Sequence, residues 1–329
     1  MVDLESIQTA ASTLGPYLHR TPMLRSEALS DSIGAPLAFK AEHLQKTGSF
    51  KPRGALNAVL ALSPEERARG VIAVSAGNHA QGVAFAARVV GISATLVMPE
   101  TATRSKVAAV EGYGARAVLV DGNRLLESME EIQLREGQVF IHPFDNPNVI
   151  SGQGTVGLEI FEDEPDVQLV VVPIGGGGLI SGVSTALKSL NPRIEVVGVE
   201  PQGSAVVSHS LAAGKPLSLD DRNTIADGLN APWSAQLSLD IIRDRVDRVM
   251  TVSDAEIARA MKLIIERTKQ LVEPSGAAGF AALLSGKVNV GGRRTATILS
   301  GGNVDVDRIS ELLGGETVLP ESPAAPARA

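Results

Sequence analysis

Four consecutive glycines, Gly175–Gly178, are the clearest indication of chemistry in this sequence. They follow the apolar run Leu169-Val-Val-Val172 and precede a segment of helical spacing. A backbone without side chains can approach an anion closely, and the N-terminus of a following helix adds positive potential. The loop therefore predicts a phosphate site, although a flexible turn, or a dinucleotide-binding loop with Glu200 as its ribose ligand, stays open. A Walker loop does not fit, because the glycines run into Leu179-Ile-Ser181 instead of Gly-Lys-Ser/Thr.

A second candidate is Lys51, in the segment Thr47-Gly-Ser-Phe-Lys-Pro-Arg-Gly54. Pro52 suits the first turn of a helix, and Phe50 and Gly54 suggest a packed setting. A desolvated lysine has a lowered pKa and can attack a carbonyl as an amine nucleophile. A nucleophilic lysine and a phosphate site in one protein are what pyridoxal phosphate requires. Two further polar loops offer Asn78 and Ser300 as contacts for its ring.

Composition excludes several classes of function. The 329 residues carry 30 basic and 37 acidic side chains, a formal net charge of −7, which argues against a nucleic-acid partner. There are no cysteines, so disulfides, thiolate nucleophiles and cysteine metal sites are absent. No apolar run reaches the ~18 residues of a membrane span, and no secretory signal is recognisable, so we expect a cytoplasmic protein. At about 150 residues per domain, the length suggests two domains.

Short β-branched runs alternate with segments of helical spacing along most of the chain. We expect strands at residues 37–40, 71–74, 94–97, 117–120, 169–172, 196–199, 248–252 and 295–299. We expect helices at residues 52–62, 78–90, 103–113, 179–189, 255–267 and 304–313. This alternation predicts an α/β fold with parallel sheets, in which residues 169–172 are apolar enough to be covered on both faces. Polar or glycine-rich turns follow three of the strands, at the position where such sheets carry their sites.

Six ordered motifs resemble those of the serine/threonine dehydratases, pyridoxal-phosphate enzymes of fold type II that include serine racemase. They extend over roughly residues 15–313 and are most similar to the short, catabolic threonine dehydratases. The motifs are Lys46-Thr-Gly-Ser-Phe-Lys-Pro-Arg-Gly-Ala55, Ser75-Ala-Gly-Asn-His-Ala-Gln-Gly82, Gly152-Gln-Gly-Thr155, Gly175-Gly-Gly-Gly-Leu179, Ala226-Asp-Gly228 and Ser300-Gly-Gly-Asn303.

The resemblance implies a tryptophan synthase β-like fold of two open, twisted, mainly parallel sheets flanked by helices. It implies a large cofactor-binding domain of residues 1–67 and 147–319 and a small mobile domain of residues 68–146. The Pro- and Ala-rich tail, residues 320–329, is expected to be disordered.

The resemblance also implies roles around pyridoxal 5'-phosphate. Lys51 would form the Schiff base with Phe50 beside it, Asn78 would hydrogen-bond the phenolic oxygen, and Ser300 would face the pyridine nitrogen. The phosphate would be held by the amides of Gly175, Gly176, Gly177, Gly178 and Leu179. The substrate carboxylate would bind the loop of Ser75, Ala76, Gly77, Asn78 and His79.

These roles imply α,β-elimination. Lys51 can take the α-proton as general base, and the neutral Ser300 hydroxyl favours rapid loss of the β-hydroxyl. We expect an ammonia-lyase acting on L-threonine, L-serine or both, with 2-oxobutanoate or pyruvate plus ammonia as products. The alternatives are a dehydratase for another β-hydroxy amino acid such as 3-hydroxyaspartate, a serine racemase, or a ligand-binding protein, against which the intact Lys51 argues. We expect an amino-acid substrate, no membrane or nucleic-acid partner, and a homo-oligomer, either dimer or tetramer.

Some positions depart from the related enzymes or have two interpretations. Ala76 stands where serine racemase has the serine that serves as second acid/base. Glu200 matches a cation ligand of racemase-like members, but Val206 replaces their aspartate, so we expect no metal. Glu273 lies near the cofactor by resemblance, or only favours the dipole of the helix after it. Phe144 replaces a polar residue of some members and is expected to form an apolar wall.

Overall fold

Two sheets organise the chain, of which the computed structural model describes residues 2–314. The predicted tail lies outside the described residues. The six-stranded sheet has the order β1-β2-β10-β7-β8-β9, and only its edge strand β1 is antiparallel. The four-stranded sheet, β5-β4-β3-β6, is parallel throughout. The strands are β1 (Met23–Arg25), β2 (Leu37–Lys40), β3 (Val71–Val74), β4 (Ala94–Pro99), β5 (Arg116–Val120), β6 (Val139–Phe140), β7 (Leu169–Pro173), β8 (Glu195–Pro201), β9 (Arg248–Val252) and β10 (Thr295–Ile298).

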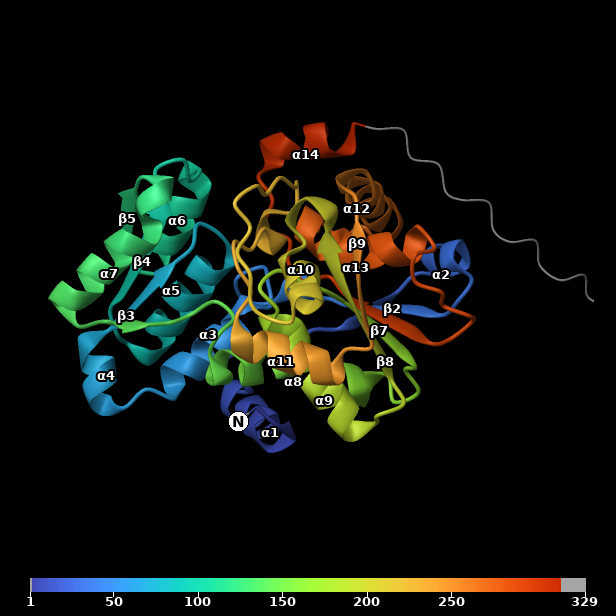
Figure 1. The fold of residues 1–329 in the computed structure, drawn as a ribbon, viewed down its shortest axis with the longest axis horizontal. Helices are drawn as coiled ribbons and strands as arrows, with labels where there is room; N and C mark the ends of the chain where they lie inside the picture. Colours follow the sequence, from blue (N-terminus) through green and yellow to red (C-terminus); the bar gives the residue numbers. More distant parts are fainter. Residues whose placement is uncertain (1, 315–329) are drawn as a thin grey trace, which may run out of the picture.

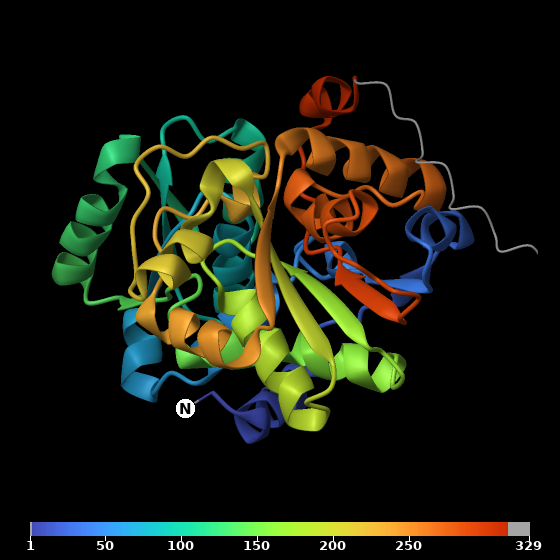
Figure 2. The same cartoon turned by 45° about the vertical axis from the view of Figure 1, so that its right-hand side comes forward.

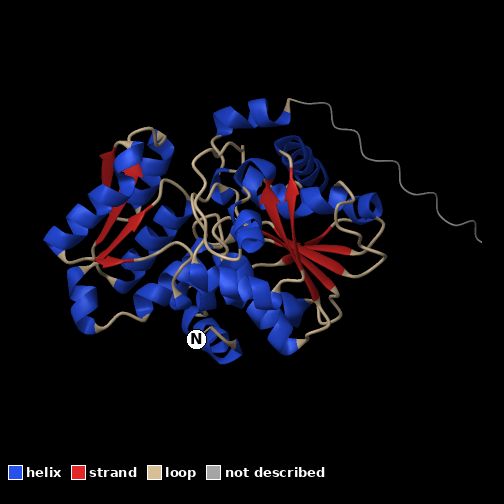
Figure 3. Ribbon diagram, in the orientation of Figure 1, coloured by secondary structure: helices blue, strands red, loops and turns tan. Residues whose placement is uncertain are grey.

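Helices cover both faces of the six-stranded sheet and surround the smaller one (Figures 1 and 3). They are α1 (Leu4–Leu14), α2 (Glu27–Ile33), α3 (Lys51–Leu60), α4 (Pro64–Arg69), α5 (Asn78–Val90), α6 (Arg104–Gly112), α7 (Leu125–Glu136), α8 (Pro147–Asp163), α9 (Gly178–Leu190), α10 (Val206–Ala213), α11 (Gln236–Arg245), α12 (Asp254–Thr268), α13 (Pro274–Leu284) and α14 (Val306–Leu313). The predicted fold class, two mainly parallel sheets flanked by helices, is confirmed.

Each of the eight expected strands corresponds to an observed one within a few residues. The strands β1 and β6 were not expected, because runs of three and two residues carry no readable alternation. Helix α3 begins at Lys51, one residue earlier than expected, although the residue before a proline is disfavoured in a helix. Pro52 is tolerated there because the first turn needs no N–H donors.

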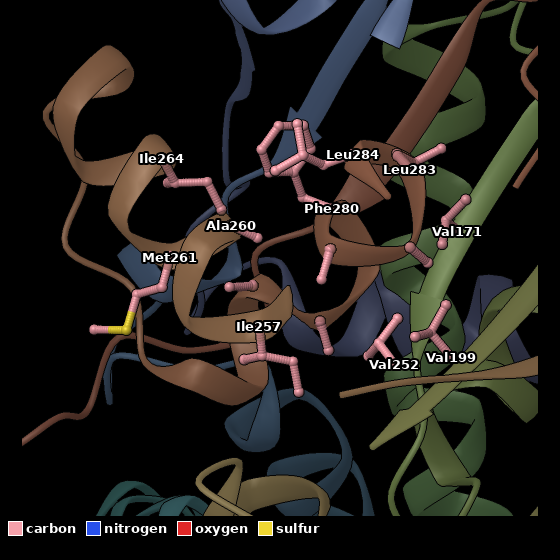
Figure 4. Close-up of a cluster of buried hydrophobic side chains, with 14 of the residues drawn as sticks. Val171, Val199, Val252, Ile257, Ala260, Met261, Ile264, Phe280, Leu283 and Leu284 are labelled. Carbon is pink, nitrogen blue, oxygen red and sulfur yellow. The ribbon is translucent and has the colours of Figure 1, made fainter. Parts of the chain in front are cut away.

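The apolar strand β7 is buried on both faces, as its composition predicts. Leu169 and Val171 belong to a core cluster beneath α12 and α13, whereas Val170 and Val172 belong to a cluster beneath α9. Figure 2 shows the strands passing between these two helical layers. In Figure 4, Phe280 of α13 and Ile257, Ala260 and Ile264 of α12 fill the first cluster beside the strands. Consecutive side chains of a strand point to opposite faces, so a strand between two helical layers is apolar at every position.

Glycines let α8 approach two other helices closely. A Cβ atom on Gly152 would lie 2.4 Å from the carbonyl oxygen of Arg53 and 2.7 Å from the Cα of Gly54 in α3. On the other side, a Cβ on Gly182 of α9 would lie 2.4 Å from the carbonyl oxygen of Ile150. The motif Gly152-Gln-Gly-Thr155 is therefore a packing surface between the helix that begins at Lys51 and the helix that follows the four glycines.

The change Gly152→Ala should destabilise the protein, because its methyl group would meet backbone atoms that cannot move independently. We expect a loss of about 1–3 kcal/mol in the free energy of unfolding, measured by denaturant titration. Gly112→Ala is the matched control, since a Cβ there meets no atom within 4 Å and the helix should gain about 0.5–1 kcal/mol. Equal stability of the Gly152 variant and the unchanged protein would contradict this packing argument.

Candidate functional site

The segment that carries Lys51 pairs with the loop that carries Ser300. Ser49 forms an antiparallel bridge with Gly301, and the Phe50 N–H donates to the Ser300 carbonyl at 3.1 Å. The Gly302 N–H donates to the Gly48 carbonyl at 2.9 Å. Both segments follow neighbouring parallel strands, β2 and β10, so their loops leave the same edge of the sheet. This pairing brings together two parts of the sequence about 250 residues apart.

Lys51 occupies the first position of α3. Its Nζ lies 3.4 Å from the Pro143 carbonyl oxygen and 5.2 Å from the centroid of the Phe50 ring. Desolvation lowers the pKa of Lys51 to about 8, and the carboxyl group of Glu273 opposes that shift. A lysine of this kind is mostly charged at neutral pH but loses its proton far more readily than an exposed lysine, and it can act as a nucleophile or a base.

The four glycines form a tightly enclosed loop between β7 and α9. Gly177 has a φ of +96°, which glycine adopts without strain. A Cβ on Gly176 would lie 2.3 Å from a ring carbon of Phe144, and one on Gly175 would lie 3.2 Å from the Cα of Leu229. The first turn of α9 leaves its N–H groups without intrahelical acceptors. Phe144 is thus an apolar wall against the loop, and the free amides suit a phosphate.

The loop Ser75–His79 lies between β3 and the first turn of α5. The Ser75 hydroxyl accepts the Gly77 N–H at 3.1 Å, and Ala76 packs with its methyl group among apolar neighbours. The His79 Nε2 lies 2.8 Å from the Ile141 carbonyl oxygen, and burial lowers the pKa of His79 to about 3. His79 is therefore neutral and anchors the loop to the segment after β6. The helix N-terminus at Asn78 suits a carboxylate.

Sequence reasoning did not single out several polar groups at the site. The hydroxyls of Thr47 and Ser49, four and two residues before Lys51, are buried, and the described residues offer neither of them a hydrogen-bond partner. Ser300, by contrast, was a predicted site residue; it is buried, and its hydroxyl donates to the Ser275 carbonyl at 3.3 Å. Thr47 and Ser49 both belong to the motif that carries Lys51. The sequence does not show, however, whether a hydroxyl is buried and unpaired or exposed to water. Unpaired buried polar atoms favour a polar ligand.

The structure brings Lys51, Asn78, the glycine loop and Ser300 to one region from four separate segments. A lysine with a lowered pKa, an amide-lined cradle and unpaired hydroxyls fit pyridoxal 5'-phosphate. The individual contacts of these residues with the cofactor stay predictions.

Comparison with known proteins decides the family. Residues 15–301 match the family model described as "Pyridoxal-phosphate dependent enzyme". The chain belongs to this family. It is 46% identical to an L-threonine ammonia-lyase of Thermotoga maritima over 95% of this chain and 78% of that protein. It is 42% identical to an L-threo-3-hydroxyaspartate ammonia-lyase of Saccharomyces cerevisiae over 93% of this chain and 95% of that protein.

The fold is also that of solved members of the family. The structure of maize serine racemase superposes with a TM-score of 0.91 at 42% identity, covering 94% of this chain and 96% of that one. These findings confirm the predicted family, fold, cofactor and class of enzyme, an ammonia-lyase dependent on pyridoxal phosphate. No helix within residues 2–314 combines the length and apolarity needed to cross a membrane.

The carboxylate of Glu200, the candidate cation ligand, is hydrogen-bonded to the first turn of a helix. Its carboxylate accepts the N–H groups of Val207 and Ser208, each at 2.8 Å, and the Ser208 hydroxyl at 2.6 Å. These are the second and third residues of α10, whose own N-cap residue, Ala205, has no side-chain acceptor. Burial raises the pKa of Glu200 to about 6 even though these hydrogen bonds oppose the shift. The carboxylate caps a helix where racemase-like members are expected to hold a cation.

The change Gly176→Val should weaken cofactor binding, because the side chain would collide with Phe144 and distort the amide cradle. We expect at least about tenfold weaker retention of pyridoxal 5'-phosphate, roughly 1.4 kcal/mol, in a fluorescence titration of the cofactor-free enzyme. Thermal unfolding of the cofactor-free variant serves as the control for folding. Unchanged affinity in a folded variant would place the phosphate elsewhere.

Removal of divalent cations should leave both activity and thermal stability unchanged, since Glu200 already has three protein donors. Glu200→Ala should instead destabilise the protein by about 0.5–2 kcal/mol, the usual effect of losing a helix cap, and added cations should not restore it. The measurements are turnover and unfolding midpoint with chelator, then with magnesium or calcium. A large loss on chelation that either ion reverses would show this prediction wrong.

Proposed function

We propose that this enzyme deaminates L-threonine and L-serine to 2-oxobutanoate and pyruvate, with release of ammonia. The observation that carries the proposal is the position of Lys51, whose pKa is lowered. Its Nζ lies 3.4 Å from the Pro143 carbonyl oxygen, next to the Phe144 ring that packs against Gly176, and its backbone packs against Gly82 of α5. The similarity to an L-threonine ammonia-lyase over nearly the whole chain supports the choice of substrate. A cytoplasmic location and a homo-oligomeric state stay predictions.

The chain's own residues account for each requirement of such a reaction. When bound, pyridoxal phosphate supplies electron withdrawal from the α-carbon of an amino acid. The amides of Gly175–Gly178 hold an anion, and the N-terminus of α5 orients a carboxylate. The Lys51 amine, uncharged in part near neutral pH, takes the α-proton. Phe144 and the buried loop exclude water from the phosphate side.

Serine racemisation is the second candidate, favoured by the likeness to maize serine racemase. Racemisation needs a second acid/base on the face opposite Lys51, since the proton must return from that side. At the expected position, Ala76 has no exchangeable proton, and the neighbouring Ser75 hydroxyl is hydrogen-bonded to the Gly77 N–H. We therefore favour elimination over racemisation. A 3-hydroxyaspartate substrate is the alternative that the yeast relative suggests.

The test is incubation of the enzyme with L-threonine, L-serine and 3-hydroxyaspartate, with ammonia and the 2-oxo acid measured together. We expect turnover of L-threonine and L-serine, and chiral chromatography should show D-serine forming far more slowly than pyruvate. Lys51→Ala is the matched control and should lose about 10²–10⁴-fold or more in rate, since it removes the proposed base. Faster turnover of 3-hydroxyaspartate, or D-serine formed as fast as pyruvate, would overturn the assignment.

A further inference from the structure

The side-chain amide of Asn78 is hydrogen-bonded at both ends by residues far away in sequence. Its Nδ2 donates to Glu273 Oε1 at 2.7 Å, and its Oδ1 accepts from Asn303 Nδ2 at 2.7 Å. Glu273 precedes α13, and Asn303 closes the loop that begins at Ser300. The amide of Asn78 therefore lies between two loops, one before α13 and one after β10, although Asn78 itself belongs to α5 beside the smaller sheet.

The hydrogen bonds establish which atom of each amide is nitrogen. Asn303 Nδ2 also donates to the backbone carbonyl of Thr47 at 2.7 Å. A backbone carbonyl only accepts, so the Asn303 atom facing Thr47 must be the nitrogen. The second hydrogen of that nitrogen needs an acceptor, so the atom of Asn78 that it meets is the oxygen. The nitrogen of Asn78 then faces Glu273, whose carboxylate accepts.

One hydrogen of Asn78 Nδ2 is left after this arrangement, because an amide nitrogen carries two and Glu273 takes one. We propose that Asn303 and Glu273 are positioning residues that hold the Asn78 amide so that this second N–H points to an oxygen acceptor of the bound cofactor. The proposal rests on the proposed function, in which pyridoxal 5'-phosphate is bound at Lys51.

The charge of Glu273 gives the arrangement a dependence on pH. In the protein without cofactor, burial raises the pKa of Glu273 to about 7; the hydrogen bond from Asn78 and the ammonium groups of Lys106 and Lys51 oppose the shift, whereas Asp227 reinforces it. Above that pH the carboxylate accepts the Asn78 N–H in a charge-assisted hydrogen bond; below it the bond weakens. The visible absorption of the bound cofactor should therefore change near neutral pH, and Glu273→Gln should remove that change while keeping an acceptor.

Asn303→Asp is the most direct test, because a carboxylate would repel the Thr47 carbonyl and the Asn78 oxygen and would turn the Asn78 amide round. We expect at least about tenfold weaker binding of pyridoxal 5'-phosphate, the loss expected for one charge-assisted hydrogen bond, and an altered absorption spectrum. Asn57→Asp is the matched control, since Asn57 also donates to a backbone carbonyl, that of Asn148 at 2.7 Å, at an exposed position. Its cofactor affinity and spectrum should not change.

The outcomes separate this proposal from the proposed function. If the unchanged protein shows no visible band with pyridoxal 5'-phosphate, the proposed function fails. If it shows the band and a folded Asn303→Asp variant has the same affinity and spectrum, only the positioning role is overturned. Should that variant not fold, the pH dependence of the Glu273→Gln spectrum and the cofactor affinity of Glu273→Ala decide. An unchanged pH dependence in Glu273→Gln, or full affinity in Glu273→Ala, refutes the role.

Discussion

The pairing of β2 with β10 is the constraint on which the rest of the site depends. These strands are about 250 residues apart in sequence, yet their segments stay hydrogen-bonded to each other beyond the strand ends. The His43 N–H donates to the Leu299 carbonyl, and the bridge between Ser49 and Gly301 follows. Backbone hydrogen bonds alone therefore set the relative positions of Lys51 and Ser300, without any side-chain contact. A register shift of one residue would move every side chain of β10 to the other face of the sheet.

A buried cluster of charges holds α3 in place two residues after Lys51. The guanidinium of Arg53 donates to Glu42 and Glu159, and Lys40, fully buried in β2, lies 2.7 Å from Glu159. Burying charges costs desolvation energy, which their mutual attraction offsets only in good geometry, so such a cluster adds little net stability. The cluster instead fixes the orientation of α3, because separating Arg53 from its partners would leave a buried charge unpaired. The direction in which α3 presents Lys51 is thereby restricted from two elements, β2 and α8.

The sequence predicted those features that depend on local patterns and missed those that depend on tertiary contacts. Short β-branched runs were enough for eight strands, and the glycines after β7 were enough to predict a tight turn into a helix; their phosphate contacts stay a prediction. The glycines of α8 resembled a family motif, but their packing role appears only in the structure, where Gly152 lies against Arg53 of α3 and Gly154 lies against Gly182 of α9. The use of Glu200 as a helix cap is a contact over only seven and eight residues, but it depends on the turn between β8 and α10, which no sequence pattern predicts.

Helix α3 packs against both sheets, and this packing fixes the position from which the flexible side chain of Lys51 extends. Leu56 and Val59 pack in the cluster of the four-stranded sheet, while Gly54 contacts α8 beneath the six-stranded one. A Cβ on Gly82 of α5 would lie 3.1 Å from the carbonyl carbon of Lys51, so α5 also packs directly against the start of α3. The lysine therefore stands where both sheets meet. Its position is determined by the packing of three helices, and the loops around it contribute the amides and hydroxyls that a ligand can use.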